Sequence, residues 1–184
     1  MATPKSTPSF AALAQQVAES GTVPETRDLL SECIKARSMD AFYAVKTLAG
    51  HMYGGFTYNY ELKAPAACAL LLWGEDGIAA LVENAKHDPT SKNIGLCLEL
   101  LASCAAGLGI GQMSIFVQTE DLKAAIASAD FRRYQQPARS ALAEYILGID
   151  DDAEAASAVG SALSKVWLSG GHETELIRAF SVRY

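Results

Sequence analysis

The sequence predicts an all-α protein, arranged as a right-handed α-solenoid of about four helical repeats. Apolar residues recur at helical spacing along most of the chain, whereas β-branched residues are sparse and no alternation of apolar and polar residues persists. Clusters of Gly, Pro and Asp interrupt these periodic segments, so each expected helix is short. Helices this short and apolar cannot bury their faces alone, which indicates a repeated packing unit.

The first part of the chain predicts a short tail and three helices. Residues 1–8 are expected to form a flexible polar tail, and residues 9–184 a single helical domain. Ser9 can cap a first helix that Gly21 ends, and Pro24 suits the first turn of a second helix. A third helix follows the polar break at residues 37–38. The apolar positions that carry the helical spacing are Phe10, Leu13 and Val17, then Leu29, Leu30, Cys33 and Ile34, then Phe42, Val45, Leu48 and Ala49.

An aromatic segment at residues 53–60 (YGGFTYNY) lacks helical periodicity and is expected to be a loop. The remaining helices are predicted after this segment, where the periodicity resumes. Helix resumes near Pro65, and a turn is expected at residues 74–77. The other expected helices are 78–86, 91–106, 113–118, 122–129, 137–147, 153–168 and 173–183.

Two of these helices are similar in sequence. CLELLASCAAG at residues 97–107 aligns with ARSALAEYILG at residues 138–148, which is a shift of 41 residues from Gly107 to Gly148. Leu101 then aligns with Leu142, and residues 41–50 have the same form. Armadillo and HEAT units recur at roughly 40–47 residues.

Residues 71–107 resemble the armadillo family, whose unit is a short helix, a glycine turn, a second helix, a turn near Asp-Pro and a long third helix. Gly77 and Ile78 stand at the glycine turn, and Asp88-Pro89 at the second turn. Residues 113–129 resemble the start of the next unit, and the likeness is clearest over 71–147. HEAT repeats and unrelated helical bundles remain alternative folds.

The resemblance implies a concave binding face lined by the third helices. The family offers a tryptophan and an asparagine there. The positions in this chain that match them are Tyr43 and Thr47, Glu99 and Ser103, and Ser140 and Glu144. Because the asparagine is missing in all three pairs, an extended peptide clamped by an asparagine ladder is not expected. Two of the six residues are carboxylates and none is basic, so a basic or polar partner segment is expected.

The aromatic loop is the second candidate surface. Tyr53, Phe56, Tyr58 and Tyr60 lie within eight residues, and leaving four rings in water is costly. They either fold back onto the helices or contact a partner, and in the second case Phe56, Tyr58 and Tyr60 are the candidate contacts.

No catalytic, metal or cofactor constellation is found, so the protein is not expected to be an enzyme. His51, His87 and His172 lie in separate units without a ligand nearby in sequence. Cys33, Cys68, Cys97 and Cys104 lie in apolar helical stretches and form no CxxC pair, so they are expected to be buried and reduced. Reduced cysteines, no secretory signal and no membrane-spanning stretch favour a cytoplasmic protein.

The predicted function is therefore a non-catalytic protein-binding scaffold or adaptor, which binds a protein or peptide partner. The alternative is a helical-repeat nucleic-acid binder that uses the local basic patch at Arg132, Arg133, Tyr134 and Arg139. A formal net charge of -6 disfavours this alternative, because an acidic chain repels a phosphate backbone.

Overall fold

The computed structural model describes residues 8–50, 60–88, 90–105 and 119–149, together with residues 156, 157 and 160. All regular secondary structure in these residues is helical, which confirms the predicted class. None of the helices in this part of the chain is both long and apolar enough to cross a membrane. The elements are α1 (Phe10–Ser20), α2 (Val23–Ala36), α3 (Met39–Gly50), α4 (Tyr60–Leu70), η1 (Leu71–Trp73), α5 (Glu75–His87), α6 (Ser91–Ala105), α8 (Glu120–Ala127), η3 (Phe131–Tyr134) and α9 (Gln135–Gly148).

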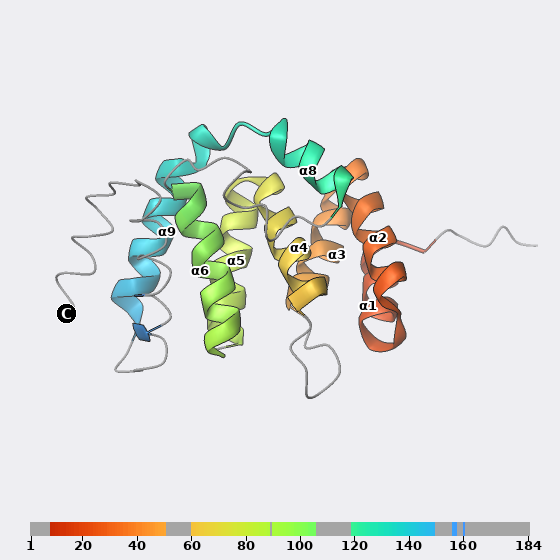
Figure 1. The fold of residues 1–184 in the computed structure, drawn as a ribbon, viewed down its shortest axis with the longest axis horizontal. Helices are drawn as coiled ribbons and strands as arrows, with labels where there is room; N and C mark the ends of the chain where they lie inside the picture. The colour runs from red at the N-terminus through yellow and green to blue at the C-terminus, as the bar shows by residue number, and fades with distance from the viewer. Residues whose placement is uncertain are drawn as a thin grey trace, which may run out of the picture.

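Most of these helices stand side by side in two layers (Figure 1). In one layer α3 contacts α5, and α5 contacts α9; in the other α2 contacts α4, and α4 contacts α6. Helix α1 packs against α3, at the end of the row. The core lies between the two layers and includes fully buried leucines from both, among them Leu48, Leu81, Leu98 and Leu101.

The first two helices begin where their capping residues predict. The Ser9 hydroxyl accepts a hydrogen bond from the Ala12 N–H at 3.2 Å. Thr22 and Glu25 form a reciprocal capping box, in which the Thr22 N–H donates to the Glu25 carboxylate at 2.7 Å. The Asp40 carboxylate on α3 also accepts from the Phe10 N–H at 2.7 Å, which ties the start of α1 to α3.

Helix α4 begins earlier than the sequence predicts. It starts at Tyr60, which was expected in the loop, and it continues through Pro65. A proline inside a helix costs about 3 kcal/mol, because one hydrogen bond is lost and its ring crowds the preceding turn. Residues 63–71 are all buried, so packing on every side of α4 offsets that cost. This burial comes from neighbouring helices and was not visible in the local pattern.

The turn between α4 and α5 is also shorter than predicted. Only Gly74, with φ +64°, lies outside the helical elements, and Gly77 is in the first turn of α5. A Cβ on Gly77 would lie 1.8 Å from the carbonyl oxygen of Leu70. The expectation that Gly77 belongs to the turn was therefore wrong. It is required inside the helix, because the start of α5 lies against the last turn of α4.

A buried polar cluster joins α4, α5 and α6 at the other end of α5. The ammonium group of Lys63 lies 3.1 Å from the Asp88 carboxylate, and both side chains are almost fully buried. The Asn93 side-chain amide donates to the carbonyl oxygens of Asn84 and Asp88, each at 2.9 Å. Burial alone would raise the pKa of Asp88, but the hydrogen bond and charge of Lys63, together with hydrogen bonds from Thr90, outweigh it and hold the pKa below its ordinary value.

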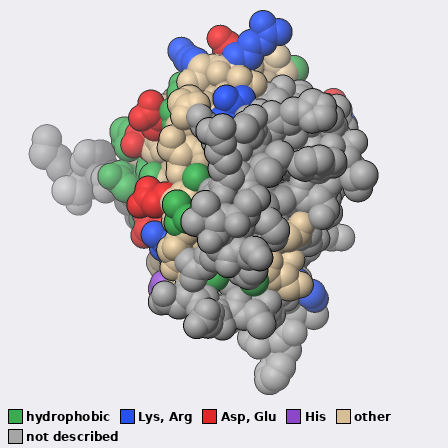
Figure 2. Space-filling view, turned by 90° about the vertical axis from the view of Figure 1, so that its left-hand side faces the viewer, with side chains coloured by type: hydrophobic (Ala, Val, Ile, Leu, Met, Phe, Trp, Pro, Cys, Tyr) green, Lys and Arg blue, Asp and Glu red, His purple; other side chains and the backbone are tan. Residues whose placement is uncertain are grey.

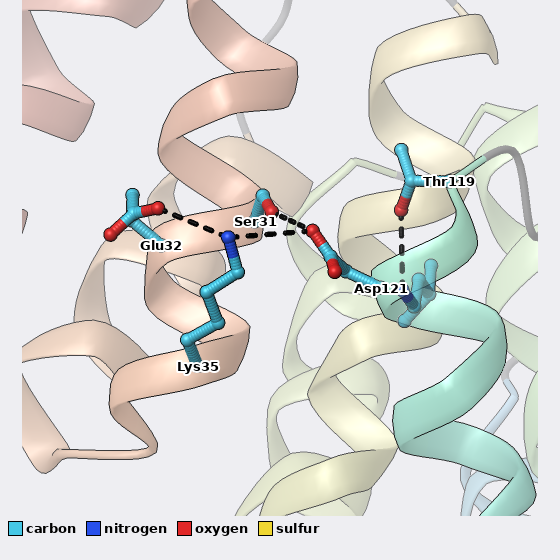
Figure 3. Close-up of polar contacts among 6 residues, drawn as sticks. Ser31, Glu32, Lys35, Thr119 and Asp121 are labelled. Carbon is cyan, nitrogen blue, oxygen red and sulfur yellow. Dashed lines mark hydrogen bonds and ion pairs between the residues drawn. The ribbon is translucent and has the colours of Figure 1, made fainter.

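Helix α8 lies across the upper ends of the standing helices in Figure 1, and it contacts α2 and α4. The Ser31 hydroxyl on α2 donates to the Asp121 carboxylate on α8, and the Lys35 ammonium lies 3.6 Å from the same carboxylate (Figure 3). Thr119 caps α8 by accepting from the Leu122 N–H at 3.3 Å. Units of a linear repeat array contact only their neighbours, so the contact between α2 and α8 departs from that pattern.

Candidate functional site

A groove runs along the surface between α5 and α9 and encloses about 370 Å³. Such a volume lies at the lower end of the range for small-molecule pockets. Its apolar walls are Ile78, Ala79 and Val82 from α5, and Pro137, Ala141 and Tyr145 from α9. Ile78 and Tyr145 are buried and form the floor, whereas Ala79 is exposed.

The groove has a polar rim with a negative balance. Glu75 and Lys86 stand on α5, and Ser140 and Glu144 on α9. All four side chains are exposed, and neither carboxylate forms an ion pair within the described residues. Asp76 and Glu83 lie on the exposed side of α5 nearby. Most of the Asp and Glu side chains visible in Figure 2 lie along the left of the view, which is the side of the molecule turned away from the viewer in Figure 1.

Two helices of parallel direction make the groove. Gly74, which precedes α5, lies against the ring of Tyr134, which precedes α9, since a Cβ on Gly74 would lie 2.6 Å from that ring. The two helices therefore start together, and they run the same way in Figure 1. Glu75 consequently marks one end of the groove and Glu144 lies toward the other.

The structure brings Ser140 and Glu144, two of the expected contact residues, together in this groove. Tyr43 and Thr47 lie in the same layer on α3, whose Lys46 forms a 2.6 Å ion pair with Glu83 of α5. Met39 and Tyr43 are about half exposed, at 50% and 55%, so the surface of α3 is also partly apolar. The outward surfaces of α3, α5 and α9 are called the outer face below.

Glu99 and Ser103 are placed differently from the other expected residues. They lie half-buried on α6, in the layer of α2 and α4, and α6 packs against α5 and α9. Helix α5 stands between α3 and α9. The sequence had predicted that α6, the helix of Glu99 and Ser103, would lie at that position. Phe56 and Tyr58 lie outside the described residues, and of Tyr60 only the backbone, at the start of α4, is described.

The basic patch is partly used to hold the fold. The Arg139 guanidinium donates to the carbonyl oxygen of Ala105 at 3.1 Å, where it caps the end of α6. The Arg133 guanidinium lies 4.9 Å from the centre of the Tyr134 ring. Arg132 and Arg133 remain exposed. The patch therefore offers two exposed cations to a phosphate backbone.

The four cysteines are buried and free, as expected. Burial raises the pKa of the Cys33, Cys68 and Cys97 thiols to about 12 and that of Cys104 to about 11. These thiols are protonated at neutral pH, and a protonated thiol is a poor nucleophile and metal ligand. Among the described residues, His, Cys, Asp and Glu form no group of three that could hold a metal ion.

The part of the groove that α5 supplies was missed from sequence. Ala79, Val82 and Lys86 follow Glu75 at helical spacing and form a stripe with small and apolar residues on the polar side of α5. This stripe was a usable signal, but only the third helices of the expected repeats, and not α5, were predicted to line the binding face. Its pairing with α9 could not be predicted, because nothing in the sequence puts α5 beside a helix that begins some 50 residues after α5 ends.

Comparison of the chain with protein-family models, curated proteins and solved structures gave no match. The armadillo resemblance accordingly stays a prediction from the sequence.

Proposed function

We propose that this protein is a non-catalytic protein-binding module, a scaffold or adaptor, which holds its partner on the outer face of α3, α5 and α9. The main observation in support of this proposal is the groove between α5 and α9. Apolar walls with a polar rim of net negative charge are the anatomy of a protein interface, in which the apolar centre supplies affinity and the rim supplies specificity.

The architecture that we propose is an armadillo- or HEAT-like α-solenoid. The two rows of neighbouring helices support this architecture, and the contact of α8 with α2 departs from the linear pattern of such an array. By analogy with other solenoids, the extended surface of such a fold suits a partner. A reducing, cytoplasmic setting is also part of the proposal, and the four free and buried cysteines support it.

The expected partner segment is basic or polar. Glu75 and Glu144 outnumber Lys86 on the rim and favour cations, and Asp76 adds to the negative field of α5, whereas Glu83 is paired with Lys46. Exposed rim charges change the association rate and its salt dependence more than they change the final affinity. A partner should therefore be captured faster at low salt than at high salt.

The test compares two double charge reversals in the full chain. Glu75→Lys with Glu144→Lys alters the groove, and Glu19→Lys with Glu120→Lys makes the same change in net charge on α1 and α8. The partner is first identified by capture with the wild-type chain and then purified. Surface plasmon resonance of the purified partner should show an association rate at low salt that falls about tenfold or more for the groove variant only.

Equal losses in both double variants would show that net charge alone decides capture, which contradicts a site at the groove. Unchanged binding by the groove variant, with unchanged helicity, contradicts it as well. Capture of RNA or DNA that is lost when Arg132 and Arg133 are replaced by Ala would favour the nucleic-acid alternative.

A further inference from the structure

We propose that the segment held in the α5–α9 groove is itself an α-helix of about three turns, with an apolar side that enters the groove and a basic residue at the end that meets Glu75. This inference rests on the proposed function, because it names the partner of that same groove.

The walls of the groove favour a helix over an extended peptide. Both walls are α-helices, and in their middle turns the backbone N–H and C=O groups are already bonded within each helix. The lining contains no asparagine or glutamine side chain, and the Ser140 hydroxyl already accepts from Gln136 at 3.4 Å. An extended peptide would find almost no partners for its own backbone here, whereas a helix satisfies its backbone internally.

The spacing of the lining residues fits a third helix laid along the other two. On α5 the lining falls at residues 75, 78, 79, 82 and 86, and on α9 at residues 137, 140, 141, 144 and 145. These are the intervals at which one side of a helix meets another helix. Ala79 and Ala141 have the smallest side chains of the apolar walls, so an apolar side chain of the partner can enter between them.

The length and charge of the partner follow from the ends of the groove. From Glu75 to Lys86 the lining extends over eleven residue steps of α5, or about 16 Å at 1.5 Å per step, which is about three helical turns. Glu75 stands at one end and is not paired within the described residues, whereas the other end carries both Glu144 and Lys86. A Lys or Arg near the Glu75 end of the partner helix would meet this carboxylate, and a polar residue suits the mixed charges of the other end.

The experiment uses two phage-displayed peptide libraries selected against the immobilised full chain. Both contain peptides of about 14 residues, roughly four helical turns. One library is built on an Ala-rich helical scaffold, and the other carries a proline at every third position, which prevents helix formation. Each selected peptide is then titrated against the wild type, Ala79→Trp, which fills the groove, and Ala124→Trp, a matched substitution at an exposed alanine of α8.

The expected result is that binders come from the helical library and are enriched in Leu, Met or Phe along one side and in Lys or Arg at one end. Their affinity should fall at least about tenfold for Ala79→Trp, as for an interface hot spot, and stay unchanged for Ala124→Trp. Circular dichroism checks that both variants keep the wild-type helicity.

The other outcomes separate this inference from the proposed function. If binders come only from the proline library and Ala79→Trp blocks them, the helix inference is overturned and the groove keeps its function. Acidic helical binders would overturn the inferred charge of the partner. A dimer of the chain itself that Ala79→Trp abolishes would make a second copy the occupant and overturn the inference. No binders, or binders indifferent to Ala79→Trp, overturn both.

Discussion

At the scale of single residues, Gly77 and Gly95 show how differently two helical glycines can be constrained. Gly77 lies where the first turn of α5 meets the end of α4, and a Cβ there would lie 1.8 Å from the Leu70 carbonyl oxygen. Gly95 lies on α6, and a Cβ there would meet nothing within 4 Å. The first position needs glycine for close approach, and the second position does not.

The two alanine variants should therefore change stability in opposite directions. Gly77→Ala should lower the free energy of unfolding by about 3 kcal/mol or more, because the obstruction is backbone and cannot move aside cheaply. Gly95→Ala should raise it by about 0.5–1 kcal/mol, since alanine loses less conformational entropy in a helix. Urea unfolding followed by circular dichroism measures both. A destabilised Gly95→Ala, or a neutral Gly77→Ala, would contradict the packing described here.

The sequence places Gly77 near a helix start but cannot show why glycine is needed there. Capping and turn residues act on their neighbours in the chain, so Ser9 and Thr22 are readable as caps from the sequence alone. The closeness of Gly77 to Leu70 depends on the angle between two helices. Such angles are set by packing, which local sequence does not encode.

At the scale of elements, α8 is held to α2 by a contact that depends on pH. The hydrogen bond from Ser31 and the charge of Lys35 lower the pKa of Asp121 from its ordinary value of 3.8. A carboxylate whose pKa is lower in the folded state stabilises that state above its ordinary pKa. This contribution is lost as the pH falls through the lower, folded value.

Asp121→Asn should loosen α8 at neutral pH without unfolding the rest. Hydrogen exchange of the α8 amides should be a few-fold faster than in the wild type, and exchange in α6 should be unchanged. At a pH well below 3.8, the wild type should lose its advantage over the variant, because its own Asp121 becomes protonated. Glu120→Gln, whose partner Lys123 is on the same helix, is the matched control and should leave α8 protected. A difference that persists at low pH would count against this origin of the docking.

The elements themselves were predictable where they are amphipathic and capped, as α1 and α2 are. Helix α8 was also expected, within two residues at each end, but its position over α2 was not. Its two fully buried residues, Leu122 and Ile126, give an ordinary amphipathic pattern that does not specify which helices they contact. The same limit applies to the groove, which needs α5 and α9 to lie side by side.

At the scale of the whole molecule, the α2–α8 contact links distant parts of the chain. Helices in a linear array can separate from its ends, since each unit contacts only its neighbours. Here α8 rests on α2 and α4, while α9, which follows it, rests on α5 and α6. Separation at either end must disturb a helix from the other half, so we expect the described helices to unfold together.

The buried cysteines provide the measurement. Cys33 is on α2, Cys68 on α4, and Cys97 and Cys104 on α6, so thiol labelling reports on three helices. In the wild type, all four cysteine thiols should become reactive at the same midpoint concentration of urea. Leu122→Ala removes a fully buried anchor of α8, at a cost of about 2–5 kcal/mol, and should let Cys33 react at a lower urea concentration than Cys97. Peptide mass spectrometry after labelling measures each site. Separate midpoints in the wild type would show that the ends unfold independently.

The contact of α8 with α2 also has an evolutionary consequence. Repeat proteins commonly change length by gaining or losing whole units, which a linear array tolerates. Ser31 and Asp121 are 90 positions apart, and the helices between them set the span that α8 must cross to reach α2. Duplication or deletion of a helical pair such as α4 and α5 would leave Asp121 out of reach of Ser31 and Lys35. Selection on this one contact would therefore keep the number of intervening helices constant while their surface residues diverge.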